Sequence, residues 1–152
     1  MDLYALLKYV HVVLAIVAVG FNASYGIWLA RAAREPAHVG HVLRGIKALD
    51  DRFANPAYGL LLVTGLSMAF VGGIPLLQTR WLVSALVLYA ALLVVGVAVY
   101  SPTLRRQIAL LDAAGPTSAE YLAAASRGRI VGIVLAVIVL AILFLMVVKP
   151  AV

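Results

Sequence analysis

The chain has 152 residues, of which 65% are hydrophobic and 12% are charged, and its formal net charge is +6. A typical soluble domain has about a quarter of its residues charged, so this composition argues against a water-soluble globule. The chain has no cysteine, which excludes disulfide bonds, thiolate metal ligands and a thiol nucleophile. We treat residues 1–152 as a single integral membrane domain.

Four apolar runs follow one another along the chain, and each is long enough to cross a bilayer. A transmembrane helix needs about 20 mainly apolar residues. Backbone groups in lipid must be hydrogen-bonded within their own segment, so each run is expected to be helical. The predicted transmembrane helices are residues 3–29, 56–73, 81–100 and 130–148. The predicted fold class is therefore all-α, a four-transmembrane-helix bundle.

The connection between the first two spans, residues 33–53, has the pattern of an amphipathic helix. Its apolar side chains recur at helical spacing, and its charged side chains take the opposite face. We expect this helix to lie on the cytoplasmic membrane surface, where anionic headgroups attract lysine and arginine. The apolar positions are Val39, Val42, Leu43, Ile46, Leu49 and Phe53, and the charged ones are Arg44, Lys47, Asp50 and Asp51.

The last span is preceded by a helix start in GPTSAEYL, residues 115–122. Thr117 and Glu120 have the spacing of a capping box, in which each side chain accepts a hydrogen bond from the backbone of the other residue. Nothing between this point and Val148 breaks a helix. The pattern predicts one long helix whose first turns project from the membrane. The alternative is a separate surface helix before the span.

The distribution of positive charge predicts the orientation. Lysines and arginines near the ends of spans favour the cytoplasmic side. The loops after the first and third spans hold most of them: Arg31, Arg34, Arg44, Lys47, Arg52, Arg105, Arg106, Arg127 and Arg129. Only Lys8, Arg80 and Lys149 fall on the other side, so both termini are expected outside (N-out/C-out). The excess of positive charge thus indicates the orientation of the chain in the membrane. We expect the lipid bilayer as a partner and no nucleic acid.

Polar residues share one face of the first predicted span. At 100° per residue, Lys8, His11, Asn22 and Tyr25 fall within one arc about 100° wide. The other positions on that arc are small or polar, whereas the rest of the helix is mostly Val, Leu, Ile and Phe. Because lipid accepts the apolar face, this polar stripe is expected to face the interior of the bundle.

His11 has the strongest functional signal, because ionisable side chains inside a membrane are costly. Neutral imidazole is a common ligand of metals and haem. Antiparallel packing brings Met68 and Tyr89 within reach of its depth, so His11, Met68 and Tyr89 are the predicted cofactor-binding residues, for haem b or copper. His11 is the predicted metal ligand. The alternative is a structural histidine that hydrogen-bonds to a neighbour such as Tyr89 or a backbone carbonyl.

Three segments carry a resemblance to a known family: LLKYVHVVLAIVAVGFNASYGIWLAR, DDRFANPAYGLLLVTGLSMAF and LLQTRWLVSALVLYAALLVVGVAVYSPTLRRQ. Over about residues 4–148 the chain resembles a bacterial family catalogued only as predicted integral membrane proteins of unknown function. The Leu-Lys-x-x-His opening also looks like two four-helix groups, the copper-resistance D-type membrane proteins and the haem-binding protoporphyrinogen oxidases. These resemblances imply a multi-pass protein of the bacterial inner (cytoplasmic) membrane.

The likeness to the oxidases implies a role for His11. In that group the histidine of the first helix ligates haem, and a lysine four residues after a tryptophan of the third helix completes the site. Trp81 would be the tryptophan, but the fourth residue after it is Ala85. The likeness therefore supports His11 as a haem contact and does not carry over the oxidase activity.

The functional hypotheses follow from what the spans contain and lack. They contain no cysteine nucleophile, no glycine-rich phosphate loop and no paired carboxylates, so an enzyme is not favoured. The leading hypothesis is a haem- or metal-handling, redox-associated membrane protein that uses His11. Two alternatives stay open, namely a non-catalytic accessory subunit of a larger membrane complex and a small transporter that works as a homo-oligomer.

Overall fold

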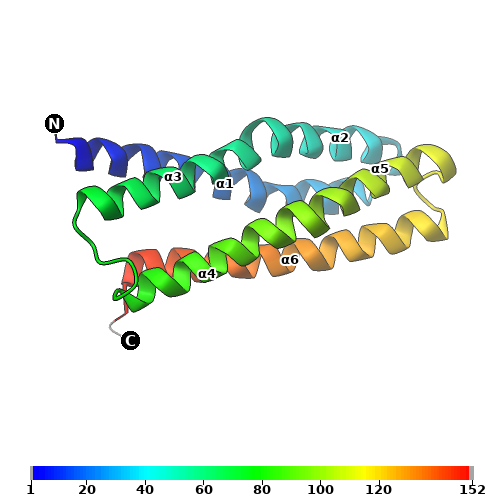
Figure 1. Cartoon of the computed structure of the whole chain (residues 1–152). Coiled ribbons are helices and arrows are strands. Elements are labelled where there is room, and N and C mark those ends of the chain that lie inside the picture. Colours follow the sequence, from blue (N-terminus) through cyan, green and yellow to red (C-terminus); the bar gives the residue numbers. More distant parts are fainter. Residues whose placement is uncertain (1, 151–152) are drawn as a thin grey trace.

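The computed structural model describes residues 2–150, which fold into long helices lying roughly side by side (Figure 1). In chain order the elements are α1 (Leu3–Ala32), η1 (Pro36–His38), α2 (Val39–Leu49), η2 (Asp50–Ala54), α3 (Asn55–Val71), α4 (Arg80–Val95), η3 (Gly96–Tyr100), α5 (Ser101–Ala114) and α6 (Ala119–Val148). Four continuous helical stretches, Leu3–Ala32, Pro36–Val71, Arg80–Ala114 and Ala119–Val148, are long and apolar enough to cross a membrane. The predicted all-α bundle of four membrane-spanning helices is confirmed.

Two of these stretches contain a π-helical segment that ends two positions before a proline. Segment η2 leads into Pro56 and η3 leads into Pro102. A proline inside a helix has no N–H to donate, and its ring clashes with the carbonyl oxygen four residues earlier. The wider π turn relieves that clash, so each helix continues through its proline. Residues 101–114, predicted to belong to the loop after the third span, therefore form helix α5.

Both described ends of the chain lie at one end of the bundle, which we call the terminal end (Figure 1). The connection between α3 and α4 lies there too (Figure 1). The opposite end is formed by α2, α5, the start of α6 and their connections, and it carries most of the lysines and arginines. We call it the basic end.

The best-buried apolar cluster lies at the basic end. It is made by Tyr25, Leu43, Ile46, Leu104 and Tyr121, which come from α1, α2, α5 and α6. Water-exposed segments must bury their apolar side chains against protein, whereas membrane segments can leave theirs to lipid. The amphipathic helix α2 accordingly packs its apolar face on α1 and α5, which corrects the expectation that this face lies on the bilayer.

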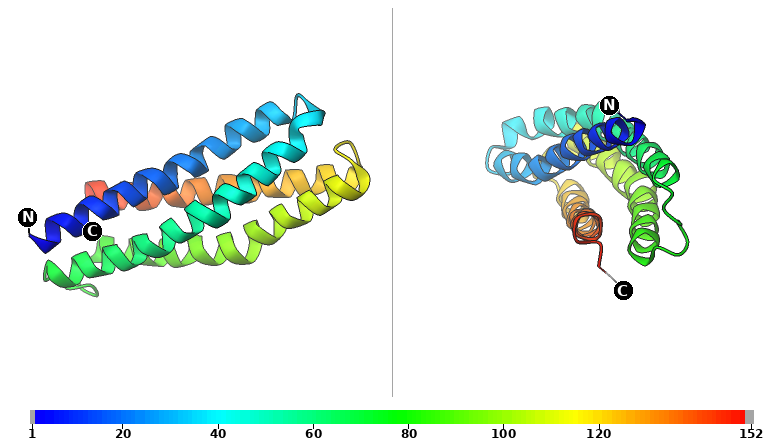
Figure 2. Two further views of the ribbon diagram at one scale, coloured as in Figure 1. Left: turned by 90° about the horizontal axis from the view of Figure 1, so that it is seen from above. Right: turned by 90° about the vertical axis from the view of Figure 1, so that its left-hand side faces the viewer.

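The membrane-spanning part consists of two helix pairs. Helix α1 packs mainly against α3, and α4 packs mainly against α6. A view along the bundle from the terminal end shows the two pairs on opposite sides (Figure 2). Helix α6 exposes Val137, Leu140 and Phe144, as expected for a helix that faces lipid. At the terminal end, the Lys149 ammonium lies 5.4 Å from the centre of the Trp81 ring and links α6 to α4.

Helix α6 is continuous from Ala119 to Val148, as the single-helix interpretation predicts. Its N-cap differs from the expectation, because Ser118 and not Thr117 accepts the hydrogen bond from a first-turn backbone N–H. The Ser118 hydroxyl oxygen lies 3.2 Å from the backbone nitrogen of Tyr121. Gly115, with φ 82°, turns the chain out of α5 just before this cap.

Candidate functional site

His11 faces α3 across the α1–α3 interface. Its Nδ1 atom lies 2.8 Å from the hydroxyl oxygen of Thr64. The Thr64 hydroxyl also lies 2.8 Å from the carbonyl oxygen of Leu60, one turn earlier in α3, to which it donates. When the Thr64 hydroxyl donates its single proton to Leu60, it can only accept from His11. That arrangement corresponds to the tautomer of His11 protonated on Nδ1, in which Nε2 keeps its lone pair.

Gly65 makes the room that the imidazole occupies. A Cβ atom at this position would lie 3.1 Å from Cε1 and 3.6 Å from Nδ1 of His11. A 3.1 Å approach is closer than ordinary van der Waals contact, so any larger residue would push the ring. Thr64 and Gly65 together fix the position of the imidazole.

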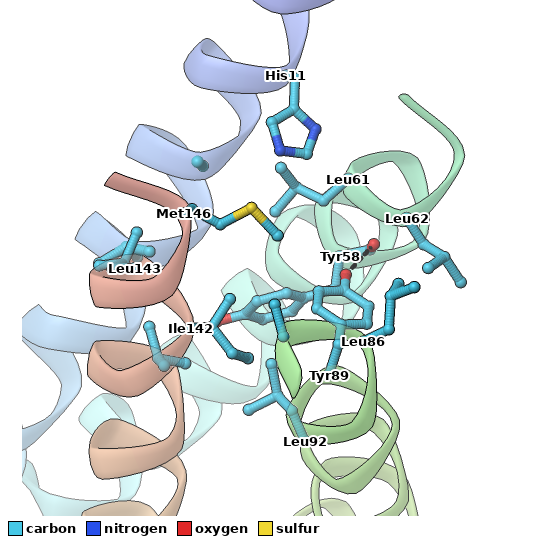
Figure 3. A pocket seen from close by; sticks show the side chains of 14 residues that line it. His11, Tyr58, Leu61, Leu62, Leu86, Tyr89, Leu92, Ile142, Leu143 and Met146 are labelled. Carbon is cyan, nitrogen blue, oxygen red and sulfur yellow. Dashed lines mark hydrogen bonds between the residues drawn. The ribbon is translucent and has the colours of Figure 1, made fainter. Parts of the chain in front are cut away.

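His11 lines a cavity of about 160 Å³ inside the helix bundle. The cavity lies between the α1–α3 pair and the α4–α6 pair, and Figure 3 shows side chains of both pairs around it. Its polar side chains are His11, Tyr58 and Tyr89. The other lining residues are Ala15, Val19, Leu61, Leu62, Ala85, Leu86, Leu92, Val139, Ile142, Leu143 and Met146. A few polar groups in an apolar cavity are typical of a ligand site.

The methionine in this cavity is Met146 of α6. Figure 3 shows its sulfur atom pointing into the cavity on the same side as the imidazole of His11. Met68, the methionine expected from sequence, lies one turn beyond Thr64 in α3 and does not line the cavity. The sequence does not single out Met146, because this residue sits in an unbroken apolar run that gives no local signal.

Two tyrosines form the base of the cavity. The Tyr89 hydroxyl donates a hydrogen bond to the backbone carbonyl of Tyr58 (Figure 3). The Tyr58 hydroxyl in turn accepts from the side-chain amide of Asn22, at 2.8 Å. Tyr89 thus lies in the cavity with His11, as the sequence predicts, but its hydroxyl is used by α3 and not by the imidazole.

The polar stripe of α1 faces the interior along most of its length. Tyr25 is buried, and His11 and Asn22 are partly buried. Asn22 also donates to the Ala18 carbonyl, at 2.9 Å. Lys8 departs from the expectation because its side chain is exposed. It lies near the terminal end, where a long lysine side chain can extend toward water.

Within residues 2–150, no group of three or more His, Cys, Asp and Glu side chains is placed to hold a metal ion. His38 bonds to Glu35 at 2.9 Å on the exposed surface, and His41 is exposed as well. A metal at His11 would therefore rely on the imidazole and on the thioether of Met146, together with any ligand that it brings itself.

A family model described as "Predicted integral membrane protein (DUF2269)" matches residues 5–150. No curated protein and no solved structure matches the chain. The family description gives no ligand or activity, so the more distant resemblance to copper-resistance and oxidase proteins stays a prediction.

Proposed function

Since the chain belongs to this family of predicted integral membrane proteins, we propose that it handles a transition metal inside the bilayer, with His11 as the principal ligand. The observation that carries the proposal is the bond between His11 Nδ1 and Thr64, at 2.8 Å. Histidines that bind metals through one ring nitrogen nearly always donate from the other nitrogen to a neighbouring oxygen. The same bond also ties α1 to α3, so the structural role and the ligand role use different nitrogens of one ring.

Met146 is the second ligand. A thioether sulfur is soft and uncharged, and it favours Cu(I) over the hard divalent ions. Imidazole and thioether are also an axial ligand pair of haem iron. The shared chemistry is thus a transition-metal centre that accepts one neutral nitrogen and one neutral sulfur ligand.

The size of the cavity favours the bare ion. Pockets for drug-sized ligands usually enclose about 300–1,000 Å³, whereas this cavity encloses about 160 Å³. A copper ion fits a cavity of this size, and a porphyrin would require the α1–α3 and α4–α6 pairs to separate. We therefore favour Cu(I) and keep haem as the second occupant to be tested.

The surroundings favour the lower charge state of the metal. Leu61, Leu86 and Ile142 line the cavity close to the proposed ligands. An apolar shell disfavours additional charge on a metal and controls its reduction potential. With two neutral ligands, Cu(I) leaves one net charge in the cavity and Cu(II) leaves two. The site should therefore stabilise the reduced ion, as expected of a redox-associated protein.

The proposal can be tested on protein purified in detergent after growth with copper and haem precursors. We expect bound copper, or a Soret band if haem is the occupant, and we expect His11→Ala to lose it. His41→Ala is the matched control, because His41 is exposed at the basic end. Equal metal and haem contents in wild type and His11→Ala would remove the proposal. A co-purifying protein partner with neither metal nor haem would favour the accessory-subunit alternative.

A further inference from the structure

Asp50 is an acid on the buried stripe of a helix. It begins η2, the segment that joins α2 to α3, and is only 5% exposed. Every other aspartate and glutamate of the chain is exposed. The buried stripe runs at spacings of three and four residues through Val39, Leu43, Ile46, Asp50, Ala54, Ala57 and Leu61. The expectation that Asp50 belongs to the charged, exposed face of the amphipathic helix is therefore wrong.

Within residues 2–150, no lysine, arginine or histidine forms an ion pair with this carboxylate. The nearby Lys47 pairs with Asp51. Asp50 instead receives a hydrogen bond from the side-chain amide of Asn55, at 3.3 Å. In the described part of the chain, no ion pair involves Asp50.

The other groups around Asp50 are phenols. Tyr25 of α1, Tyr58 of α3 and Tyr100 of η3 are close enough for the Asp50 charge to act on them. The Tyr25 hydroxyl is buried and has no hydrogen-bond partner among residues 2–150.

Burial without a counter-charge favours the neutral acid. An isolated buried carboxylate is costly, and such groups normally become protonated instead. Asp50 lies before the apolar span of α3, at the basic end. Burial there raises the pKa of its carboxyl above the usual value; the negative charge of Asp51 adds to the effect, and Asn55 and Lys47 oppose it.

A polar groove that is open to the surface lies beside this site. It encloses about 360 Å³ where η2 and the start of α3 face the end of α4, η3 and the start of α5, and it is lined by Asp51, Asn55, Tyr58, Leu93, Val97, Ser101, Pro102 and Arg105. We call it the junction groove. A water molecule takes about 30 Å³ in the liquid, so the groove has space for several. Asn55 lines the groove and also donates to Asp50, which places the acid one side chain away from it.

We propose that Asp50 is a proton-binding site, which the folded protein holds as a neutral carboxylic acid and which exchanges its proton with water through the junction groove. The ligand is a proton, taken up by a carboxylate oxygen from water in the groove and returned by the reverse step. No electron is transferred. This site lies at the opposite end of α1 from His11, and it does not depend on metal binding there.

Infrared spectroscopy of the intact protein at neutral pH tests this directly. A protonated carboxyl group has a C=O stretching band that a carboxylate lacks. We expect this band in the wild type, its loss in Asp50→Asn and its retention in Asp51→Asn, because Asp51 is exposed and paired with Lys47. Absence of the band from the wild type, or its persistence in Asp50→Asn, would overturn the proposal.

Thermal unfolding in detergent gives a second readout. The unfolded chain ionises Asp50 at the ordinary pKa and the folded chain at a higher one, so the folded state binds more protons in between. The contribution of Asp50 to stability is therefore greatest at low pH and is lost as pH rises through the folded-state pKa. Wild-type Tm should fall over that range, and Tm of Asp50→Asn should fall less.

Asn55→Ala keeps the test usable if Asp50→Asn does not fold. This substitution removes the hydrogen bond from Asn55 that favours the ionised form of Asp50, so the pH at which Tm falls should move upward. Sodium and potassium buffers must give the same curves. A Tm rise specific to sodium would identify a metal-ion site and would contradict a proton site, as would an unchanged pH profile in Asn55→Ala.

Discussion

The Nδ1 atom of His11 and the hydroxyl oxygen of Thr64 lie 2.8 Å apart across the α1–α3 interface. When the Thr64 hydroxyl donates its proton to the Leu60 carbonyl, this contact requires the tautomer of His11 that is protonated on Nδ1. That tautomer leaves the lone pair of Nε2 available to a metal. The first two predictions concern this arrangement.

Replacing Thr64 by valine should weaken metal binding while leaving the size of the side chain nearly unchanged. Without the hydroxyl, the imidazole loses the acceptor that holds Nδ1–H, and loss of such a supporting partner typically costs about 10- to 100-fold in metal affinity. Thr64→Ser retains the hydroxyl and should bind nearly as well as the wild type. Competition titration with a Cu(I) chelator measures both. Equal affinity of Thr64→Val and wild type would show that the bond does not prepare the ligand.

Adding one methyl group at Gly65 should disturb the same ring by contact alone. The new Cβ would lie 3.1 Å from Cε1 of His11, so the imidazole must move by a few tenths of an ångström. We expect Gly65→Ala to lower copper affinity in the same titration. Gly59→Ala is the matched control, because a Cβ at Gly59 meets no atom within 4 Å. Similar losses in both variants would point to a general effect on α3.

The hydrogen bond from Asn22 to Tyr58 should contribute measurably to packing of α1 on α3. The amide nitrogen and the hydroxyl oxygen are 2.8 Å apart. A double-mutant cycle with Asn22→Ala and Tyr58→Phe should give a coupling energy of about 0.6 kcal/mol, the mean found for hydrogen bonds between membrane helices. Reversible unfolding in mixed micelles supplies the four free energies of unfolding. Strict additivity of the two substitutions would rule out this bond as a stabilising contact.

Ser118 should cap α6, and Thr117 should not. Ser118→Ala removes the acceptor for the Tyr121 N–H and should cost about 1 kcal/mol in the free energy of unfolding. Thr117→Ala should cost little, because that side chain is exposed and does not accept the capping bond. The same unfolding assay compares the two variants. A larger loss for Thr117→Ala would restore the capping box expected from the sequence.

Much of the fold could be predicted from the sequence, because membrane-spanning helices can be recognised from their length and apolar composition alone. The four spans and the helical character of residues 39–49 follow from that pattern. Helix α5 could not be predicted in this way, because a proline such as Pro102 normally marks the end of a helix. The π-helical segment before Pro102, which lets the helix continue, depends on tertiary packing and not on a local sequence pattern. The charge of Asp50 predicts the exposed face of the helix, whereas its spacing from the apolar residues places it on the buried face, and the structure follows the spacing.

The site was predictable only in part. His11 stood out because it is an ionisable residue in an apolar run, but its neighbours depend on how the helices pack. Thr64 could have been predicted as a neighbour of His11 from its depth in the bundle. It lies seven residues from the end of α3 at Val71, and His11 lies eight residues from the start of α1 at Leu3, so the two are at similar depths. Met146 could not be distinguished from Met68 without the packing of α6.

X-ray absorption at the copper edge of the Cu(I)-loaded protein tests the central claim most directly, because it reports the atoms bound to the metal. We predict nitrogen and sulfur ligands in the wild type, loss of the sulfur contribution in Met146→Leu and its retention in Met68→Leu. His11→Ala should abolish loading. A wild-type spectrum without sulfur, or a sulfur contribution that survives Met146→Leu, would contradict the proposed pairing of His11 with Met146.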